Sequence, residues 1–211
     1  MNLRIGVIDS GKGGEYISNL IKEAFPKASI IRYMKEEFVS YAGISLESLF
    51  IEADEHINFL AHNNVDAIVI GCMTLSVNAL EYIKSKVYCP VFDLYTCLNF
   101  VSSNTTIIAT YNTIESGRFD FCNTIDGQNL SGLIEEYLPW INKNHECESE
   151  QEYFTRIIEE CYTAHRRPVS NTLLIGCSHY FWVEKYLIDV FNPSVIIHPG
   201  KELVKELKLL L

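Results

Sequence analysis

The chain has 211 residues, of which 48% are hydrophobic, and it carries a formal charge of −10. This length allows one large domain or two small ones, and the hydrophobic fraction is sufficient for a packed core. The negative charge disfavours nucleic acids and anionic membranes as partners, although backbone N–H groups at helix starts could still bind an acidic small molecule.

The seven cysteines are irregularly spaced and include no Cys-x-x-Cys pair. This pattern fits neither a disulfide framework nor a zinc site. The first four residues lead directly into a strand-like run, without the apolar region of a signal peptide, and no apolar stretch approaches the roughly 20 residues that span a bilayer. We therefore expect free thiols and a soluble, cytoplasmic protein.

Strand-like runs alternate with helical patterns in the first half, which predicts a parallel sheet with crossover helices. Strands are expected at residues 4–9, 29–34, 66–70 and 90–94. Helical spacing of apolar residues predicts one helix that ends at Pro26 and another from Leu46 to Leu60. Between the first strand and helix, the turn Asp9-Ser10-Gly11 could bind a carboxylate, although capping of the helix by Asp9 is the simpler interpretation.

The same alternation begins again near residue 105. Strands are expected at residues 105–110, 121–125, 172–175 and 195–198, and helices at 133–140, 149–161, 179–191 and 201–211. Pro139 should limit the first of these helices, Ser149 and Glu152 form a capping box for the second, and residues 142–149 read as a polar loop. We expect two α/β domains related by an approximate repeat, at residues 1–95 and 96–197, with a terminal helix at 198–211 that returns to the first.

Each half contains an apolar run that ends in Gly-Cys. Residues 68–70 precede Gly71-Cys72, and residues 173–175 precede Gly176-Cys177. Such runs are typical of buried parallel strands, and α/β sheets bind ligands at the carboxyl ends of their strands. A buried cysteine usually only packs, but packing does not require the same dipeptide in both halves. Two opposed thiols at one cleft could invert a stereocentre by proton transfer.

Several polar residues should lie near these thiols. Asp9 should be close to Cys72 if the first and third strands are neighbours, and it could accept a proton. His179 could stabilise a Cys177 thiolate or position a substrate, or it could simply cap or pack. Tyr41 and four hydroxyl residues also fall at strand ends, where ordinary capping is the alternative explanation. The four are Thr74, Thr110, Thr113 and Ser178.

These motifs, in this order, resemble those of the glutamate racemases and the wider aspartate/glutamate racemase family. Residues 5–14 are similar to the family's Gly-Val-Phe-Asp-Ser-Gly-x-Gly-Gly, and residues 71–74 to its Ala-Cys-Asn-Thr. Residues 109–116 resemble its Ala-Thr-x-x-Thr-Val-x-Ser, and residues 174–180 its Leu-Gly-Cys-Thr-His-Tyr. Ile134-Glu135 is similar to a Val-Glu pair that precedes the second cysteine motif. The resemblance extends from residue 3 to about residue 202.

The resemblance implies two pseudo-symmetric, parallel-sheet α/β domains with the active site between them. It implies an amino-acid racemase that needs no metal or pyridoxal phosphate and that supplies a D-amino acid for peptidoglycan. Cys72 and Cys177 would exchange the Cα proton, with Asp9 assisting Cys72 and with Glu135 and His179 assisting Cys177. The residues expected to bind the substrate are Ser10, Tyr41, Ala42, Met73, Thr74, Thr110, Thr113 and Ser178. The expected partner is a small amino acid, neither nucleic acid nor membrane, and a homodimer is compatible with the pattern.

The sequence departs from the family pattern in three ways. Met73 stands where the family has Asn, residues 40–43 replace the usual Pro-Tyr-Gly, and the second half is short. Glutamate is the default substrate, with aspartate or another amino acid as the alternative. A one-thiol relative such as a decarboxylase fits less well, because both cysteines are present. From a different class, an inactive relative that binds an amino acid or a protein remains open.

Overall fold

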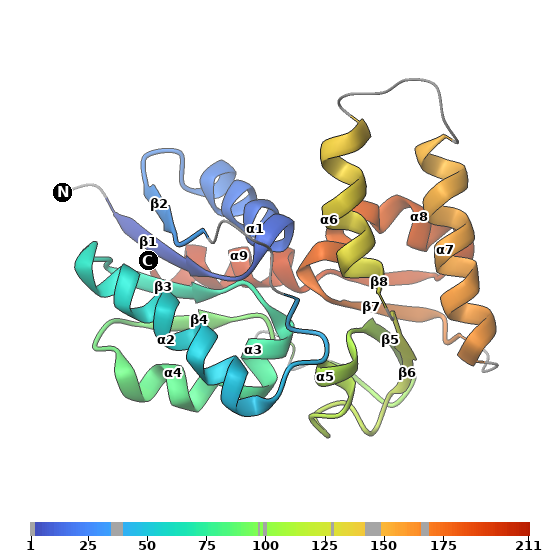
Figure 1. Cartoon of the computed structure of the whole chain (residues 1–211), viewed down its shortest axis with the longest axis horizontal. Helices are drawn as coiled ribbons and strands as arrows, with labels where there is room; N and C mark the ends of the chain where they lie inside the picture. Colours follow the sequence, from blue (N-terminus) through green and yellow to red (C-terminus); the bar gives the residue numbers. More distant parts are fainter. Residues whose placement is uncertain are drawn as a thin grey trace.

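The computed structural model describes residues 3–34, 40–96, 98, 101–127, 129–141, 149–165 and 169–211. Within these ranges, eight strands form two parallel four-stranded sheets, each flanked by helices (Figure 1). The predicted α/β class with parallel sheets is therefore confirmed.

The first sheet has the strand order β2-β1-β3-β4. Its strands are β1 (Arg4–Ile8), β2 (Ser29–Arg32), β3 (Ala67–Ile70) and β4 (Val91–Asp93). Its helices are α1 (Gly11–Ala24), α2 (Leu46–His62), α3 (Met73–Asn78) and α4 (Leu80–Lys86). Strands β1 and β3 are apolar and buried almost throughout because helices cover both faces of the sheet, whereas the edge strand β2 is only partly buried.

The second sheet repeats this arrangement in the order β6-β5-β7-β8. Its strands are β5 (Thr105–Ala109), β6 (Asn123–Asp126), β7 (Thr172–Gly176) and β8 (Val195–Ile197). The helices of this part are α5 (Tyr111–Ile114), α6 (Leu130–Ile141), α7 (Glu150–His165) and α8 (Glu184–Phe191), with a 3-10 helix, η1 (Ser178–Val183), before α8. Because the two orders match, β3 and β7 hold equivalent positions in their sheets.

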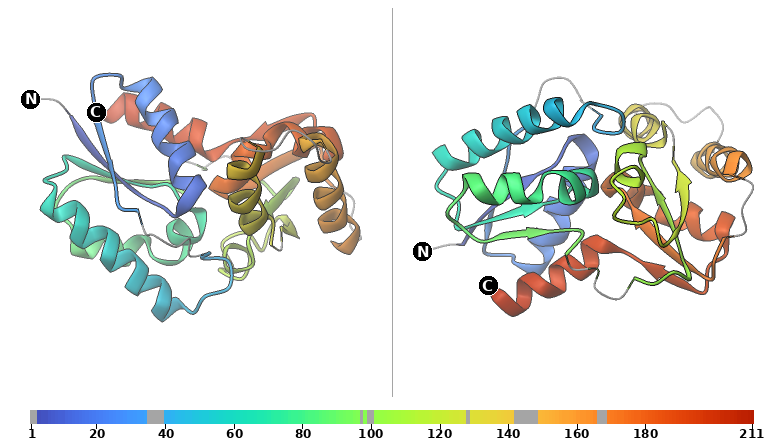
Figure 2. Two further views of the ribbon diagram at one scale, coloured as in Figure 1. Left: turned by 45° about the horizontal axis from the view of Figure 1, so that its top comes forward. Right: turned by 90° about the horizontal axis from the view of Figure 1, so that it is seen from below.

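The last helix, α9 (Pro199–Leu210), leaves β8 and packs against α1 of the first half (Figure 2). Leu203 and Leu207 are fully buried in one hydrophobic cluster with Ile17 of α1. His198 caps the helix by accepting a hydrogen bond from the Lys201 N–H. Helix α9 therefore contacts the first half, and the division of the chain into domains stays a prediction.

Three local predictions differ from the structure. Helix α6 begins at Leu130 and continues past Pro139 to Ile141, because a proline this near the end of a helix removes only one hydrogen bond. Residues 179–191 form two pieces, η1 and α8, instead of one helix. The short helices α3, α4 and α5 have too few residues to show a clear period, and the sequence did not predict them.

Other predictions agree with the structure where it describes the chain. Ser149 and Glu152 form the reciprocal hydrogen bonds of a capping box at the start of α7. Residues 142–148, most of the predicted polar loop, lie outside the described residues. The described cysteines that are free thiols are Cys72, Cys89, Cys122, Cys161 and Cys177.

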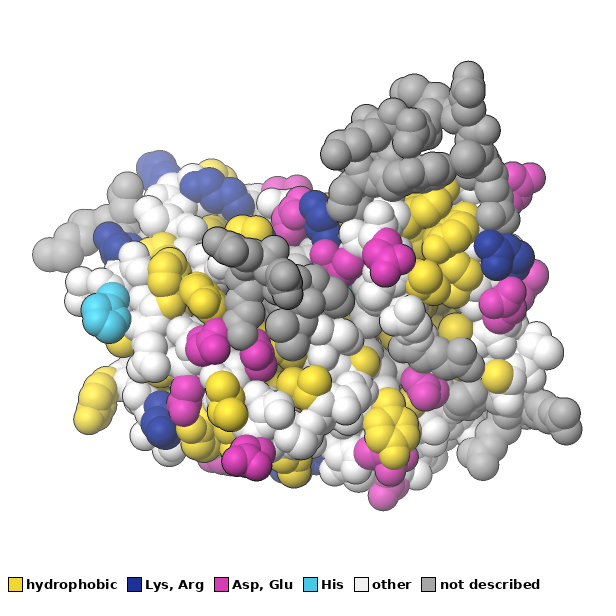
Figure 3. Space-filling view, viewed as in Figure 1, with side chains coloured by type: hydrophobic (Ala, Val, Ile, Leu, Met, Phe, Trp, Pro, Cys, Tyr) yellow, Lys and Arg dark blue, Asp and Glu magenta, His cyan; other side chains and the backbone are white. Residues whose placement is uncertain are grey.

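The surface carries acidic side chains on both halves of the face drawn in Figure 3, as expected from the net charge. None of the described helices combines the length and the hydropathy of a membrane span.

Candidate active site

One cavity lies where the carboxyl ends of the two sheets meet, and it encloses about 270 Å³, including space open to solvent. Its lining residues are Asp9, Ser10, Ser40, Tyr41, Ala42, Cys72, Thr74, Thr110, Ser131, Cys177, Ser178 and His179. Cys72 follows β3 and Cys177 follows β7, and each is 8% exposed. The structure therefore brings both thiols to a single cavity from equivalent strand ends.

Each cysteine follows a glycine because the strand ends are tightly packed. A Cβ at Gly71 would lie 3.2 Å from Oδ2 of Asp9, and a Cβ at Gly176 would lie 2.7 Å from the Cβ of Ala109. An added carbon would crowd Gly176 more severely than Gly71, where its neighbours need to shift by only a few tenths of an ångström. The repeated Gly-Cys dipeptide thus has a packing reason as well as a chemical one.

Asp9 lies beside Cys72, because β1 and β3 are neighbouring strands. Its Oδ1 accepts a hydrogen bond from the Ser10 N–H at 2.8 Å, whereas its buried Oδ2 has no hydrogen-bond partner among the described residues. Burial raises the pKa of Asp9 to about 6, although the charge of His179 opposes this shift. Burial, and then the charge of Asp9, raise the pKa of the Cys72 thiol well above its usual value. Cys72 is therefore a thiol at neutral pH.

Cys177 has a different neighbour, His179, whose Nδ1 lies 3.9 Å from the sulfur. The other ring nitrogen, Nε2, lies 2.8 Å from Oε1 of Glu135 on α6. Burial alone would lower the pKa of His179, but the contacts with Cys177 and Glu135 outweigh burial and raise the pKa to about 10. An imidazolium cation therefore stands beside Cys177 at neutral pH.

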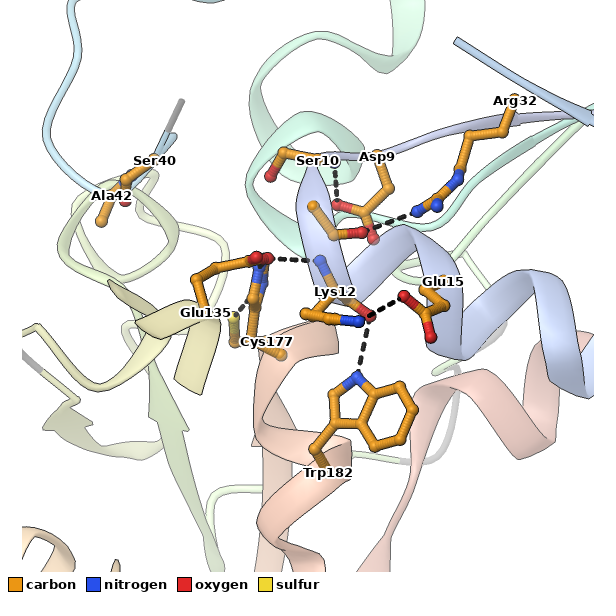
Figure 4. A network of polar contacts seen from close by, with 12 residues as sticks. Asp9, Ser10, Lys12, Glu15, Arg32, Ser40, Ala42, Glu135, Cys177 and Trp182 are labelled. Carbon is orange, nitrogen blue, oxygen red and sulfur yellow. Dashed lines mark hydrogen bonds and ion pairs between the residues drawn. The ribbon is translucent and has the colours of Figure 1, made fainter. Parts of the chain in front are cut away.

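Glu135 also connects α6 to the first half (Figure 4). Its carboxylate accepts the backbone N–H of Lys12 in the first turn of α1. Burial opposes ionisation of Glu135, but the hydrogen bonds from His179 and from Lys12 lower its pKa. The indole of Trp182 donates to the Lys12 carbonyl at 2.8 Å, so η1 holds the same turn.

Three threonine hydroxyls form a closed group at the edge of the cavity. Oγ1 of Thr74 lies 3.0 Å from Oγ1 of both Thr110 and Thr113, which are 3.2 Å from each other. Thr74 belongs to α3 and the other two to the start of α5, so the group joins the two halves. Thr74 and Thr110 line the cavity, whereas Thr113 is fully buried behind them.

Most of the predicted site residues meet at the cavity, but Met73, Thr113 and Glu135 do not line it. The side chain of Met73 is 1% exposed and packs in the hydrophobic core with Val77, one turn later in α3, because a long apolar side chain at this position is stabilised by burial. Glu135 contacts the site only indirectly, through its hydrogen bond with His179.

Two lining residues, Ser40 and Ser131, were not among the predicted site residues. Ser131 lies four residues before Glu135 on α6, so the two share a helix face, and this spacing was the signal that could have identified it. Among the described residues, no group of three His, Cys, Asp or Glu side chains is arranged to hold a metal ion.

Comparison with known proteins identifies similar sequences. No protein-family model matches the chain. It is 29% identical over 225 residues to the glutamate racemase of Trichodesmium erythraeum, covering 98% of this chain and 80% of the relative. It is 26% identical over 213 residues to the glutamate racemase of Aquifex aeolicus, covering 98% and 82% of the two chains.

Solved structures show the same fold. Glutamate racemase isoform RacE1 from Bacillus anthracis superposes with a TM-score of 0.82 at 23% identity, covering 99% of this chain and 81% of the other. The Francisella tularensis glutamate racemase, solved in complex with D-glutamate, gives a TM-score of 0.81 at 24% identity, covering 100% and 81%. The chain is thus similar in sequence to glutamate racemases over nearly its whole length, and it shares their fold.

Proposed function

We propose that this protein is a cofactor-independent amino-acid racemase with glutamate as its substrate. The observation that carries the proposal is the pair of thiols, Cys72 and Cys177, which line one cavity from equivalent strand ends. The sequence similarity to glutamate racemases over 98% of the chain supports the choice of reaction and substrate.

In the proposed reaction, one sulfur acts as a thiolate and removes the Cα proton, so that an S–H bond forms as the C–H bond breaks. The electron pair moves into the adjoining carboxylate. The other thiol then gives its proton to the opposite face of Cα and becomes the thiolate. The numbers of protons and electrons are conserved, and no external oxidant or reductant is consumed.

The charged neighbours would assist the two sulfurs in different ways. The His179 imidazolium would stabilise a thiolate at Cys177, and Glu135 would hold the imidazolium in place. Asp9 would accept the proton of Cys72, since burial raises its pKa to about 6, near neutrality. The hydroxyls of Ser10, Thr74 and Ser178 would bind the substrate's charged groups in the cavity.

The decisive experiment is proton exchange at Cα. The protein is incubated with each L- and D-amino acid in D2O, and deuterium entering Cα is followed by NMR. We expect exchange with glutamate, and we expect both Cys72→Ser and Cys177→Ser to reduce the appearance of the opposite enantiomer by at least about 100-fold. Cys89→Ser is the matched control, since this cysteine lies outside the cavity, and it should leave exchange unchanged.

A second candidate is a racemase of another amino acid, such as aspartate. The observation that favours it is Met73, which replaces the family's asparagine and packs in the core, so a polar group is missing from the cavity. Loss of one such partner costs about 1–3 kcal/mol, enough to change the preferred substrate. Fastest exchange with aspartate would support this candidate. Absence of exchange with every amino acid, in folded protein, would instead indicate an inactive binding relative.

The resemblance also supports a cytoplasmic role, in which the enzyme provides a D-amino acid for peptidoglycan, and assembly as a homodimer. Analytical ultracentrifugation would test the homodimer directly.

A further inference from the structure

The loop that enters α2 forms one wall of the cavity, and a residue of the second half holds it. Tyr41 and Ala42 of this loop line the cavity. The side-chain amide of Asn112, on α5, donates to the carbonyl oxygens of Tyr41 at 3.0 Å and Ile44 at 2.8 Å. Its backbone N–H donates to the carbonyl of Ala42 at 3.2 Å. Figures 1 and 2 show the loop passing beside α5.

Asn112 is itself tied to the helix that follows Cys72. Its carbonyl accepts a hydrogen bond from Nδ2 of Asn78, at the end of α3, at 3.0 Å. The same Asn78 amide donates to the carbonyl of Thr74 at 3.0 Å. The loop is therefore linked through Asn112 and Asn78 to Thr74, two residues beyond Cys72.

Asn112 has no direct access to a ligand, because it is not among the residues that line the cavity. An asparagine side chain has two N–H donors, and here each binds a different carbonyl of the loop. On its far side, the loop is anchored to α2 by the Tyr41 hydroxyl, 3.2 Å from Nε2 of His56. Asn112 thus supplies the backbone anchor, and Tyr41 supplies the side-chain anchor.

We propose that Asn112 is a positioning residue, which fixes the wall formed by Tyr41 and Ala42 and so makes substrate binding in the first half depend on the second half. The inference rests on the proposed racemase function. Neither Cys72 nor Cys177 belongs to this loop. Loss of the anchor should therefore weaken substrate binding much more than it slows the proton transfer.

The test uses Asn112→Asp and Asn112→Ala. The first removes both N–H donors and places a carboxylate against two carbonyls, and the second removes the donors without adding a charge. Each should raise KM about tenfold, as expected from the loss of roughly one net hydrogen bond, while kcat changes by less than about threefold. Amide hydrogen exchange of residues 40–45 should become faster, and exchange in β5 should stay slow.

Asn123→Asp is the matched control. Asn123 is also a half-buried asparagine of the second half, and its Nδ2 donates to the Ser170 hydroxyl at 3.2 Å. It starts β6, at the opposite end of the sheet from the cavity. This variant should leave KM and the exchange of residues 40–45 unchanged.

The outcomes separate this proposal from the proposed function. Unchanged exchange of residues 40–45 in both Asn112 variants would overturn the anchor, and faster exchange with an unchanged KM would overturn its role in binding. Fast exchange in β5 of both variants would show that Asn112 serves the fold as a whole, which also overturns the proposal. If the unaltered protein racemises no amino acid, the proposed function fails, while loop exchange still decides whether Asn112 is the anchor.

Discussion

Asp9 is the residue at which the stability of the fold and the proposed proton exchange conflict most. Its side chain is 1% exposed, and its Oδ2 has no hydrogen-bond partner among the described residues. A buried carboxylate without full hydrogen bonding destabilises a fold. The same burial raises the pKa of Asp9 to about 6, which suits a group that exchanges protons near neutrality. Stability and function therefore make opposite demands at this position.

We expect Asp9→Asn to stabilise the protein at neutral pH while it slows Cα exchange. The folded-state pKa of about 6 exceeds the ordinary value of 3.8, so the carboxylate lowers stability above pH 6, and this cost disappears below about pH 4. Two pH units correspond to about 3 kcal/mol, an upper limit for the gain in the free energy of unfolding. Urea unfolding across this pH range tests it, and an equal gain at pH 4 and at pH 7.5 would contradict the explanation.

At the level of single residues, the strand pattern predicted the groups that follow strands, whereas some groups on helices were missed. Cys72, Cys177 and Asp9 could be predicted, because parallel strands end at the same edge of a sheet. Asn112 could not, because the position of a helical side chain depends on how the helix packs, and Ser131 could be found only from its spacing to Glu135. Met73 was expected at the substrate from its place in a motif, and its hydrophobicity instead places it in the core.

The start of α1 depends on a residue of another element. Its N-cap, Ser10, makes no side-chain capping hydrogen bond, and its first turn has no acidic residue. Glu135 of α6 provides the missing acceptor for the Lys12 N–H. A carboxylate at this end of a helix is also favoured by the helix dipole. One side chain therefore stabilises α1 and orients His179.

This arrangement requires a glycine at position 11. Gly11 has φ +42°, and a Cβ there would collide with the Glu135 carboxylate. We expect Gly11→Ala to lower the free energy of unfolding by at least about 2 kcal/mol. Gly43→Ala is the control, since nothing lies within 4 Å of the added carbon, and it should change stability by less than about 0.5 kcal/mol. Equal effects of the two substitutions in urea unfolding would refute the proposed collision.

For whole elements, periodicity predicted the strands and the long helices. Helix α6 shows the limit of the approach, since Pro139 marked an end in the sequence, whereas the observed helix continues to Ile141. The four residues of α5 are too few to show a period. Yet α5 carries Thr113 and Asn112, whose hydrogen bonds join the two halves. The sequence pattern therefore did not predict a helix that connects the halves.

In the molecule as a whole, α9 joins the two halves by following β8 and packing on α1. We expect Leu207→Ala to lower the free energy of unfolding by about 2–5 kcal/mol, because this side chain is fully buried. Leu209→Ala, two residues later and 84% exposed, should change it by less than about 0.5 kcal/mol. Similar values for both variants in urea unfolding would show that α9 contributes little to the core.

The repeated Gly-Cys runs predicted a repeated sheet, and the observed strand orders agree with it. The relative placement of the halves was not predictable, because it depends on contacts between residues far apart in the chain. The hydrogen bonds from Lys12 to Glu135 and from Asn112 to Tyr41 are of this kind.

The two sulfurs occupy matching places, yet a carboxyl group neighbours one and an imidazolium the other. Mirror-image amino acids have equal free energies in water, so no catalyst can move their equilibrium constant away from unity. The unlike neighbours can make kcat and KM differ between the forward and reverse directions, but the quotient kcat/KM must be identical in both. A lasting excess of one enantiomer must therefore come from another reaction that removes its mirror image or supplies it separately.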